Sequence, residues 1–210
     1  MLLFKSIKKI RLTILNFLFI GGVFADPIGE IIEQTGSTQL IRDKEEIVVT
    51  GAYMPEIELY DTAETANGKM KIEFLDKAQL DLKEHSEVYI DEIYYDPDPS
   101  LSKMSMKFTM GTARFASGSL GLVNKANIDI QTPTATIGIR GTDFTTTIDE
   151  LGRSLIVLLP DANGSPSGEI SVTNLGGTVV LSEAYQATMV STLDSAPTNP
   201  VTINGITPSM

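Results

Sequence analysis

Apolar side chains occupy every second position through most of the chain after residue 25, and this period is typical of strands with one buried face. The clearest run places Met104, Met106, Phe108 and Met110 on one face, with Ser105, Lys107 and Thr109 between them. A helix would need apolar residues three or four positions apart, and the best segment of that kind is short, residues 28–34. The pattern therefore predicts an all-β fold, with a helix at most over 28–34.

Three apolar pairs, 72/74, 80/82 and 88/90, repeat at a spacing of eight residues. Short strands at such regular spacing are typical of a sandwich, a barrel or a β-solenoid. Stacked coils of a solenoid would produce the repeat, and so would the hairpins of a meander. We expect a β-solenoid or β-roll-like domain with a C-terminal β extension, while solenoid and sandwich both remain open.

Turn-forming residues divide these strands. Asn67-Gly68 and Asn163-Gly164 predict type I′ hairpin turns, because Asn and Gly tolerate positive φ. Residues 95–102 hold two prolines and residues 161–168 are rich in Gly, Pro and Ser, so both segments are predicted to be loops. Residues 194–210, rich in Pro, Thr, Ser and Asn, are predicted to form a weakly ordered tail.

The first 25 residues have the layout of a secretory signal peptide. Four basic residues precede an apolar run over 12–24, and Val23-Phe24-Ala25 places small residues at a cleavage site. The run is about 13 residues long, short of the ~20 that span a bilayer as a helix. We expect cleavage after Ala25, no membrane span afterwards, and a location in the periplasm or on the cell surface or outside a Gram-negative bacterium. An uncleaved membrane anchor is the alternative.

Charge and composition exclude several classes of function. The chain has 16 Lys and Arg against 27 Asp and Glu, a net charge of −11, and loss of residues 1–25 would make it −15. Such an acidic chain is not expected to bind nucleic acid, which requires clustered basic residues. The absence of cysteine excludes disulfides, thiolate metal sites and thiol nucleophiles, and one histidine leaves little room for histidine-based catalysis.

No motif identifies an enzyme, so we expect none, and no cofactor. The acidic residues Asp91, Glu92, Asp96, Asp98, Asp149 and Glu150 include no pair that the sequence selects for glycoside hydrolysis. Asp91, Asp96 and Asp98 do not have EF-hand spacing, which leaves calcium only as an alternative ligand, beside a surface glycan. Ser100-Leu-Ser-Lys103 matches a Ser-x-x-Lys pattern without its companion motifs. His85 lies at a predicted turn.

The most informative motif is the run Thr-Pro-Thr-Ala-Thr-Ile-Gly-Ile-Arg-Gly-Thr-Asp-Phe over residues 132–144. It resembles the signature near the end of FecR-type domains. Upstream segments resemble the same family in order: 48–51, 72–82, 86–92, 94–97 and 110–115. The resemblance covers about 29–148 and implies a FecR-like β domain over 26–148. Alternation and composition then predict a C-terminal β extension over 149–193 and the tail over 194–210.

Residue chemistry gives this motif a structural role. Pro133 is expected to end strand pairing after Thr132, and Gly138 and Gly141 permit close backbone approach or positive φ. Arg140 differs in parity from its isoleucine neighbours and should face outward, where it either pairs with a carboxylate or carbonyl of a neighbouring strand or contacts a partner. The candidate site residues are Thr132, Pro133, Gly138, Arg140, Gly141 and Thr142.

The resemblance also implies a class of function. Namesake family members are inner-membrane transducers whose periplasmic FecR domain receives a signal and whose cytoplasmic region regulates a sigma factor. Only about 11 residues precede the apolar segment here, so we expect a stand-alone exported protein without that region. Its expected role is a non-enzymatic protein-interaction, sensing or scaffolding module with an unknown protein partner. The alternatives are a glycan- or calcium-binding surface protein and a component of a sigma-regulating signalling system.

Overall fold

A computed structural model describes residues 26–123 and 127–204. These residues form seventeen strands, one short α-helix and one 3-10 turn. The elements are β1 Gly29–Thr35, β2 Thr38–Arg42, β3 Glu45–Val49, β4 Glu56–Ile57, β5 Thr62–Thr65, β6 Lys69–Phe74, β7 Gln79–Leu82, β8 Glu87–Tyr94, η1 Pro99–Leu101, β9 Lys103–Ala116, α1 Ser119–Val123, β10 Ile128–Gln131, β11 Thr136–Arg140, β12 Asp143–Ile148, β13 Ser154–Leu158, β14 Glu169–Asn174, β15 Gly177–Leu181, β16 Gln186–Val190 and β17 Val201–Thr202.

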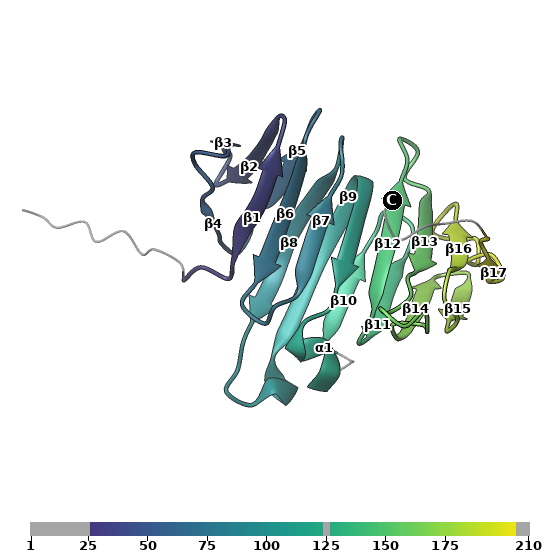
Figure 1. The fold of residues 1–210 in the computed structure, drawn as a ribbon. Helices are drawn as coiled ribbons and strands as arrows, with labels where there is room; N and C mark the ends of the chain where they lie inside the picture. The colour runs from purple at the N-terminus through teal and green to yellow at the C-terminus, as the bar shows by residue number, and fades with distance from the viewer. Residues whose placement is uncertain (1–25, 124–126, 205–210) are drawn as a thin grey trace, which may run out of the picture.

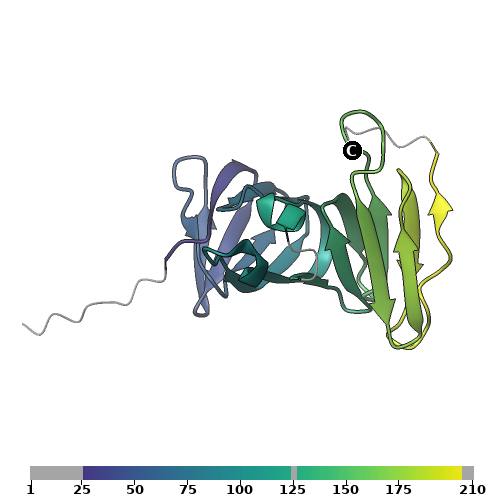
Figure 2. The same cartoon turned by 90° about the horizontal axis from the view of Figure 1, so that it is seen from below.

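The strands lie in two layers with the core between them (Figures 1 and 2). Layer A has the order β4-β1-β6-β7-β9-β12-β13-β16-β17. Layer B has the order β3-β2-β5-β8-β9-β10-β11-β14-β15. Among these pairings only β9 with β10 is parallel. Since β9 pairs in both layers, the strands form one open sheet that folds over on itself, and the predicted all-β fold is confirmed.

Strand β9 changes layer halfway along its length. Residues 103–110 pair with β8 in layer B, and residues 111–116 pair with β12 in layer A. At the crossing Gly111 has φ 85°, and a Cβ there would lie 2.3 Å from the His85 carbonyl oxygen. The buried side chains of β9 are at even-numbered positions before the crossing, as at Met106 and Phe108, and at odd-numbered positions after it, as at Phe115. Met110, predicted to share the buried face, is 41% exposed instead because it precedes this bend.

The successive hairpins β6–β7 and β8–β9 lie in different layers, and they carry the eight-residue repeat. Ile72 and Leu80 are antiparallel partners on β6 and β7 in layer A, whereas Val88 belongs to β8 in layer B. The repeat therefore arises from antiparallel hairpins, and the pairings do not confirm a solenoid. Strands β13 to β17 continue both layers beyond the motif, so the C-terminal strands extend the same sheet.

Four phenylalanines fill the centre of the core: Phe74, Phe108, Phe115 and Phe144. Phe115 and Phe144 are cross-strand partners on β9 and β12, with ring centroids 6.1 Å apart at an interplanar angle of 53°. Such tilted aromatic pairs contribute about 0.5–1.5 kcal/mol beyond the area that they bury. The core thus ties the two layers together beside the strand that they share.

Several local predictions differ from the structure. The segment over 28–34 is not a helix: residues 29–34 belong to strand β1, which pairs with β6. Asn67-Gly68 connects layer B to layer A, neither residue has positive φ, and near Asn163 only Gly164 does, at 81°. The residues with paired positive φ are Asp43 and Lys44, at 51° and 70°, which form the type I′ turn between β2 and β3.

The segment after residue 193 also differs from the weakly ordered tail that was expected. Val201 pairs with Ala187 of β16, and the Thr188 hydroxyl donates to the Thr198 carbonyl oxygen at 2.7 Å. The predicted signal peptide, residues 1–25, and residues 205–210 lie outside the described part of the chain. Within the part that is described, no helix is long and apolar enough to cross a membrane.

Candidate functional site

A groove of about 900 Å³ lies on the outer face of layer A. Strands β7, β9, β12 and β13 supply its floor, and the β13–β14 loop, residues 159–168, supplies one wall. We call it the outer groove. Its floor consists of the side chains that alternate with the core residues, so the period-two pattern of these strands places them outside.

One row of cross-strand partners runs along this floor. Asp81 of β7 lies opposite Arg114 of β9, Arg114 lies opposite Thr145 of β12, and Thr145 lies opposite Val157 of β13. Lys71, on β6, continues the row beyond Asp81 and forms an ion pair with it, with Nζ 3.7 Å from Oδ1. The floor therefore changes from charged to apolar along one line across the sheet.

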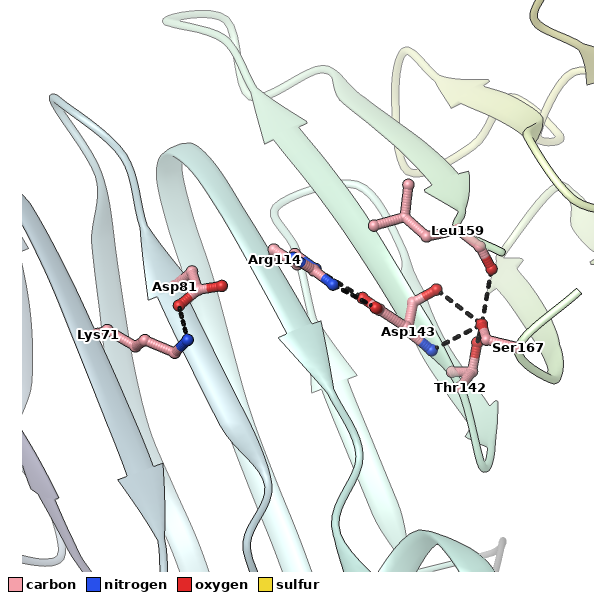
Figure 3. Close-up of polar contacts among 7 residues, drawn as sticks. All are labelled: Lys71, Asp81, Arg114, Thr142, Asp143, Leu159 and Ser167. Carbon is pink, nitrogen blue, oxygen red and sulfur yellow. Dashed lines mark hydrogen bonds and ion pairs between the residues drawn. The ribbon is translucent and has the colours of Figure 1, made fainter. Parts of the chain in front are cut away.

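Arg114 and Asp143 form the strongest polar contact of the groove (Figure 3). The Arg114 guanidinium donates from Nε to Asp143 Oδ1 at 2.9 Å and from Nη2 to Oδ2 at 2.6 Å. Bonding to Asp143 raises the pKa of Arg114, although partial desolvation acts in the opposite direction. Because a bidentate pair fixes the plane of the guanidinium, Arg114 presents one defined surface to the groove.

Ser167 fastens the wall to the floor (Figure 3). Its Oγ accepts a hydrogen bond from the Asp143 backbone N–H at 2.9 Å and lies 2.7 Å from the Leu159 carbonyl oxygen, to which its hydroxyl donates. Thr142, almost fully buried, lies 3.3 Å from the same Oγ, and its own N–H donates to Ser117 Oγ at 2.9 Å. These bonds hold the loop over residues 159–168 in place, so the wall is built into the fold.

Apolar side chains line the other half of the groove. Leu155 and Leu159 are half-buried at its surface, and Ile203 borders it from the C-terminal segment. The apolar run over 155–159 predicts a fully buried strand, but only Ile156, Val157 and Leu158 are buried. The run is continuous because its outward positions, Leu155, Val157 and Leu159, line the groove.

The structure separates the predicted motif residues. Thr132 and Pro133 form the β10–β11 turn, where the Thr132 N–H donates to the Ala135 carbonyl oxygen at 2.8 Å. Gly138 lies on the outer face of layer B, where a Cβ would be 2.7 Å from Ser171 Oγ. Only Gly141, with φ 54°, and Thr142 reach the outer groove, where the chain passes from layer B to layer A.

Arg140 faces outward, as its parity predicts, and its side chain is 62% exposed. Its Nη1 lies 3.1 Å from Oε1 of Glu169, its cross-strand partner on β14. This is the neighbouring carboxylate that the structural interpretation requires. Exposed pairs of this kind contribute at most about 1 kcal/mol. A contact with a partner protein stays a prediction for this residue.

The acidic residues do not converge. Asp91 pairs with Lys107 at 2.9 Å, Asp96 accepts the Tyr94 hydroxyl at 2.7 Å, and Asp98 accepts the Ser100 N–H at 3.0 Å. Hydrogen bonding to the Ser100 side chain, followed by the bond from its N–H, lowers the pKa of Asp98. Over residues 26–123 and 127–204, no three His, Cys, Asp or Glu side chains are grouped so that they could hold a metal ion.

Two buried carboxylates, Asp61 and Asp76, are not indicated by any sequence motif. Asp61, fully buried, receives Arg42 Nε at 2.8 Å and Nη2 at 2.7 Å. Asp76 accepts the Ala78 N–H at 3.0 Å, the Leu120 N–H at 3.2 Å and the Tyr95 hydroxyl at 3.3 Å. Burial, followed by the charge of Asp76, raises the pKa of Tyr95. Both carboxylates join segments that are distant in sequence, and no local motif signals such contacts.

Comparison with known proteins gives one family. The profile described as FecR protein matches residues 61–160, which include all four floor strands of the outer groove and the motif over 132–144. No curated protein matches. Among solved structures, a proposed anti-sigma factor from Parabacteroides distasonis ATCC 8503 aligns with a TM-score of 0.48 and 9% identity. That alignment covers 64% of this chain and 56% of the other, so it spans little more than half of that protein. Residues 61–160 of this chain thus match the FecR protein family.

Proposed function

We propose that this protein is an exported, non-enzymatic module of a bacterial cell envelope that holds a protein partner in the outer groove. The observation that carries the proposal is the groove itself, whose four floor strands lie within the FecR match and which has Gly141, Thr142 and Asp143 of the motif in its lining. Its volume of about 900 Å³ is comparable to that of small-molecule pockets, so it has room for side chains of a partner. The basic and apolar layout of the first 25 residues supports export.

The chemistry of the groove favours a polypeptide segment with one polar and one apolar side. Arg114 and Thr145 offer polar contacts, while Leu155 and Leu159 offer apolar ones a strand away. Arg114 is already neutralised by Asp143, so it would orient a partner without requiring a single anionic group. Binding in this way needs positioning and complementarity rather than a reacting group.

Site-specific photo-crosslinking in the native envelope tests this function. A photoreactive amino acid at position 145, in the groove, should give a discrete product, and one at Thr136, exposed on layer B, should not. Leu155→Asp should abolish the product, whereas Leu151→Asp, at a side chain 78% exposed outside the groove, should leave it unchanged. No product at position 145, or a product unaffected by Leu155→Asp, would refute the groove as the partner site.

A second candidate role is membership of a signalling system that regulates a sigma factor, and the FecR match favours it. Deletion of the gene should then change transcription from promoters of one alternative sigma factor. The Leu155→Asp variant should reproduce the change if the same groove carries the signal. Unchanged transcription in the deletion strain would remove this role and leave the crosslinking result intact.

Calcium and a surface glycan are the remaining alternative ligands. Ligands that bind the folded state raise its unfolding temperature, so titration of the purified protein with Ca²⁺ and with envelope polysaccharide separates them from a protein partner. An unchanged unfolding temperature in both titrations is the result expected from the protein-binding role.

A further inference from the structure

The two layers end in four edge strands, and three of them carry features that prevent pairing with another chain. A sheet edge presents unpaired N–H and C=O groups, and proteins protect it with short strands, proline or charge. In layer A, β4 and β17 are each two residues long and follow Pro55 and Pro200. In layer B, β3 begins with the exposed acids Glu45 and Glu46.

The fourth edge, β15, has none of these features. It is five residues long, and no charged residue or proline occurs from Asn174 to Ser182. Val180 is 45% exposed, and Leu175, in the turn before the strand, is 81% exposed. The β15 edge is therefore uncharged and partly apolar, and it has neither the two-residue length and preceding proline of β17 nor the acidic residues of β3.

The register of β15 identifies which of its backbone groups are free. Asn174 and Gly177 close a two-residue turn, and antiparallel partners alternate between hydrogen-bonded and non-hydrogen-bonded pairs. Val179 and Leu181 therefore bond to β14, while the N–H and C=O groups of Thr178 and Val180 point away from it. Residues 194–196 lie against Gly176 and Gly177, while Thr178 and Val180 farther along the strand are exposed.

We propose that β15 pairs with β15 of a second copy of this chain, antiparallel about a two-fold axis at Val179. In that register Thr178 of one copy lies opposite Val180 of the other, and the free groups of both form hydrogen bonds in two equivalent pairs. Isologous two-fold contacts of this kind are the commonest in soluble oligomers.

Charge selects a second copy as the occupant. Two copies of an acidic protein repel each other wherever their acidic surfaces meet, and the uncharged run over 174–182 lets two copies pair along five residues without like charges opposed, whereas the uncharged β17 offers only two residues. The same pairing at β3 would place Glu45 and Glu46 of each copy along the interface. The dimer uses layer B, so it is independent of the outer groove on layer A, and failure of either proposal leaves the other testable.

A proline at position 180 gives the sharpest test by sedimentation equilibrium of the purified protein. Val180→Pro removes an N–H that β14 does not use, so the fold should persist while each dimer loses two hydrogen bonds. We expect the wild type to have the mass of two chains and the variant to dissociate at least about 100-fold more readily. Val48→Pro, which removes an outward N–H from the acidic edge β3, is the matched control and should remain dimeric.

Amide hydrogen exchange gives a second readout that does not depend on a variant. In the dimer the Thr178 and Val180 amides should be protected in a concentration-dependent manner, while Val179 and Leu181 should be protected at every concentration by their bonds to β14. A wild type that is monomeric at about 100 µM, or that has rapidly exchanging Thr178 and Val180 amides in the dimer, would overturn the proposal.

Discussion

Replacing Thr146 by valine should stabilise this protein. The Thr146 hydroxyl lies in the core at 0% exposure and has no hydrogen-bond partner among the described residues. A buried hydroxyl without a partner costs about 1–3 kcal/mol, and valine has nearly the same shape without that group. Allowing for imperfect repacking, Thr146→Val should raise the free energy of unfolding by about 1–2 kcal/mol.

Thr188 is the matched control. Thr146 and Thr188 are the two cross-strand partners of Ile156 in layer A, and both are buried. The Thr188 hydroxyl, however, donates to the Thr198 carbonyl oxygen at 2.7 Å. Thr188→Val should therefore lower the free energy of unfolding by about 1–2 kcal/mol, so the same chemical change has opposite signs at neighbouring positions.

Urea unfolding of the two variants measures this difference. Thr146→Val should raise the midpoint with the m-value unchanged, and it should raise the thermal midpoint by about 2–8 °C. Thr188→Val should lower both midpoints. If Thr146→Val is neutral or destabilising while Thr188→Val behaves as expected, the Thr146 hydroxyl has a partner, such as a buried water, and the reasoning is refuted.

Three further predictions concern buried and paired charges. Arg42→Ala leaves the buried Asp61 carboxylate without its ion-pair partner and should lower the free energy of unfolding by about 3–5 kcal/mol in chemical denaturation. Arg153→Ala, which breaks an exposed pair, should lower it by less than about 1 kcal/mol. Equal losses in the two variants would contradict the burial of Asp61. Asp76→Ala leaves three hydrogen-bond donors without their acceptor and should lower the free energy of unfolding by about 2–4 kcal/mol. An unchanged unfolding midpoint would exclude this prediction. Burial, followed by the charge of its cross-strand partner Glu64, raises the pKa of Glu87, so the native state loses stability as pH rises from the ordinary glutamate pKa through the raised one. Glu87→Gln should remove that part of the pH dependence and add about 0.2–1 kcal/mol at neutral pH, and a pH–stability profile parallel to the wild type would disprove the assignment.

Local pattern was enough to predict the strands but not their partners. Alternation correctly identified the strands around Ile72, Leu80 and Met106, because burial on one face repeats every two residues regardless of which strand lies alongside. The layer to which each strand belongs depends on its pairing with strands distant in sequence. The eight-residue repeat is compatible with more than one such set of pairings. The shift of buried positions from Phe108 to Phe115 marks the crossing of β9, yet each half alone reads as an ordinary strand.

Turns and the groove were harder to predict for different physical reasons. The type I′ turn is formed by Asp43 and Lys44, which lack the Gly signal, while Asn67-Gly68 carries that signal and connects two layers. The motif over 132–144 supplied Gly141, Thr142 and Asp143 to the groove, but Arg114 and Ser167 come from a strand and a loop that only the fold brings to them. Such sites depend on tertiary register, which no single segment specifies.

The sharing of β9 between the layers has a consequence for folding. Its fourteen residues pair with β7, β8, β10 and β12, so neither layer has a complete set of partners until this one strand is placed. Most of those pairings join parts of the chain that are distant in sequence, which raises the free-energy barrier to folding and slows it. The same dependence means that the FecR domain and the strands that follow it should unfold in a single transition, since loss of β9 would release both faces of the molecule at once.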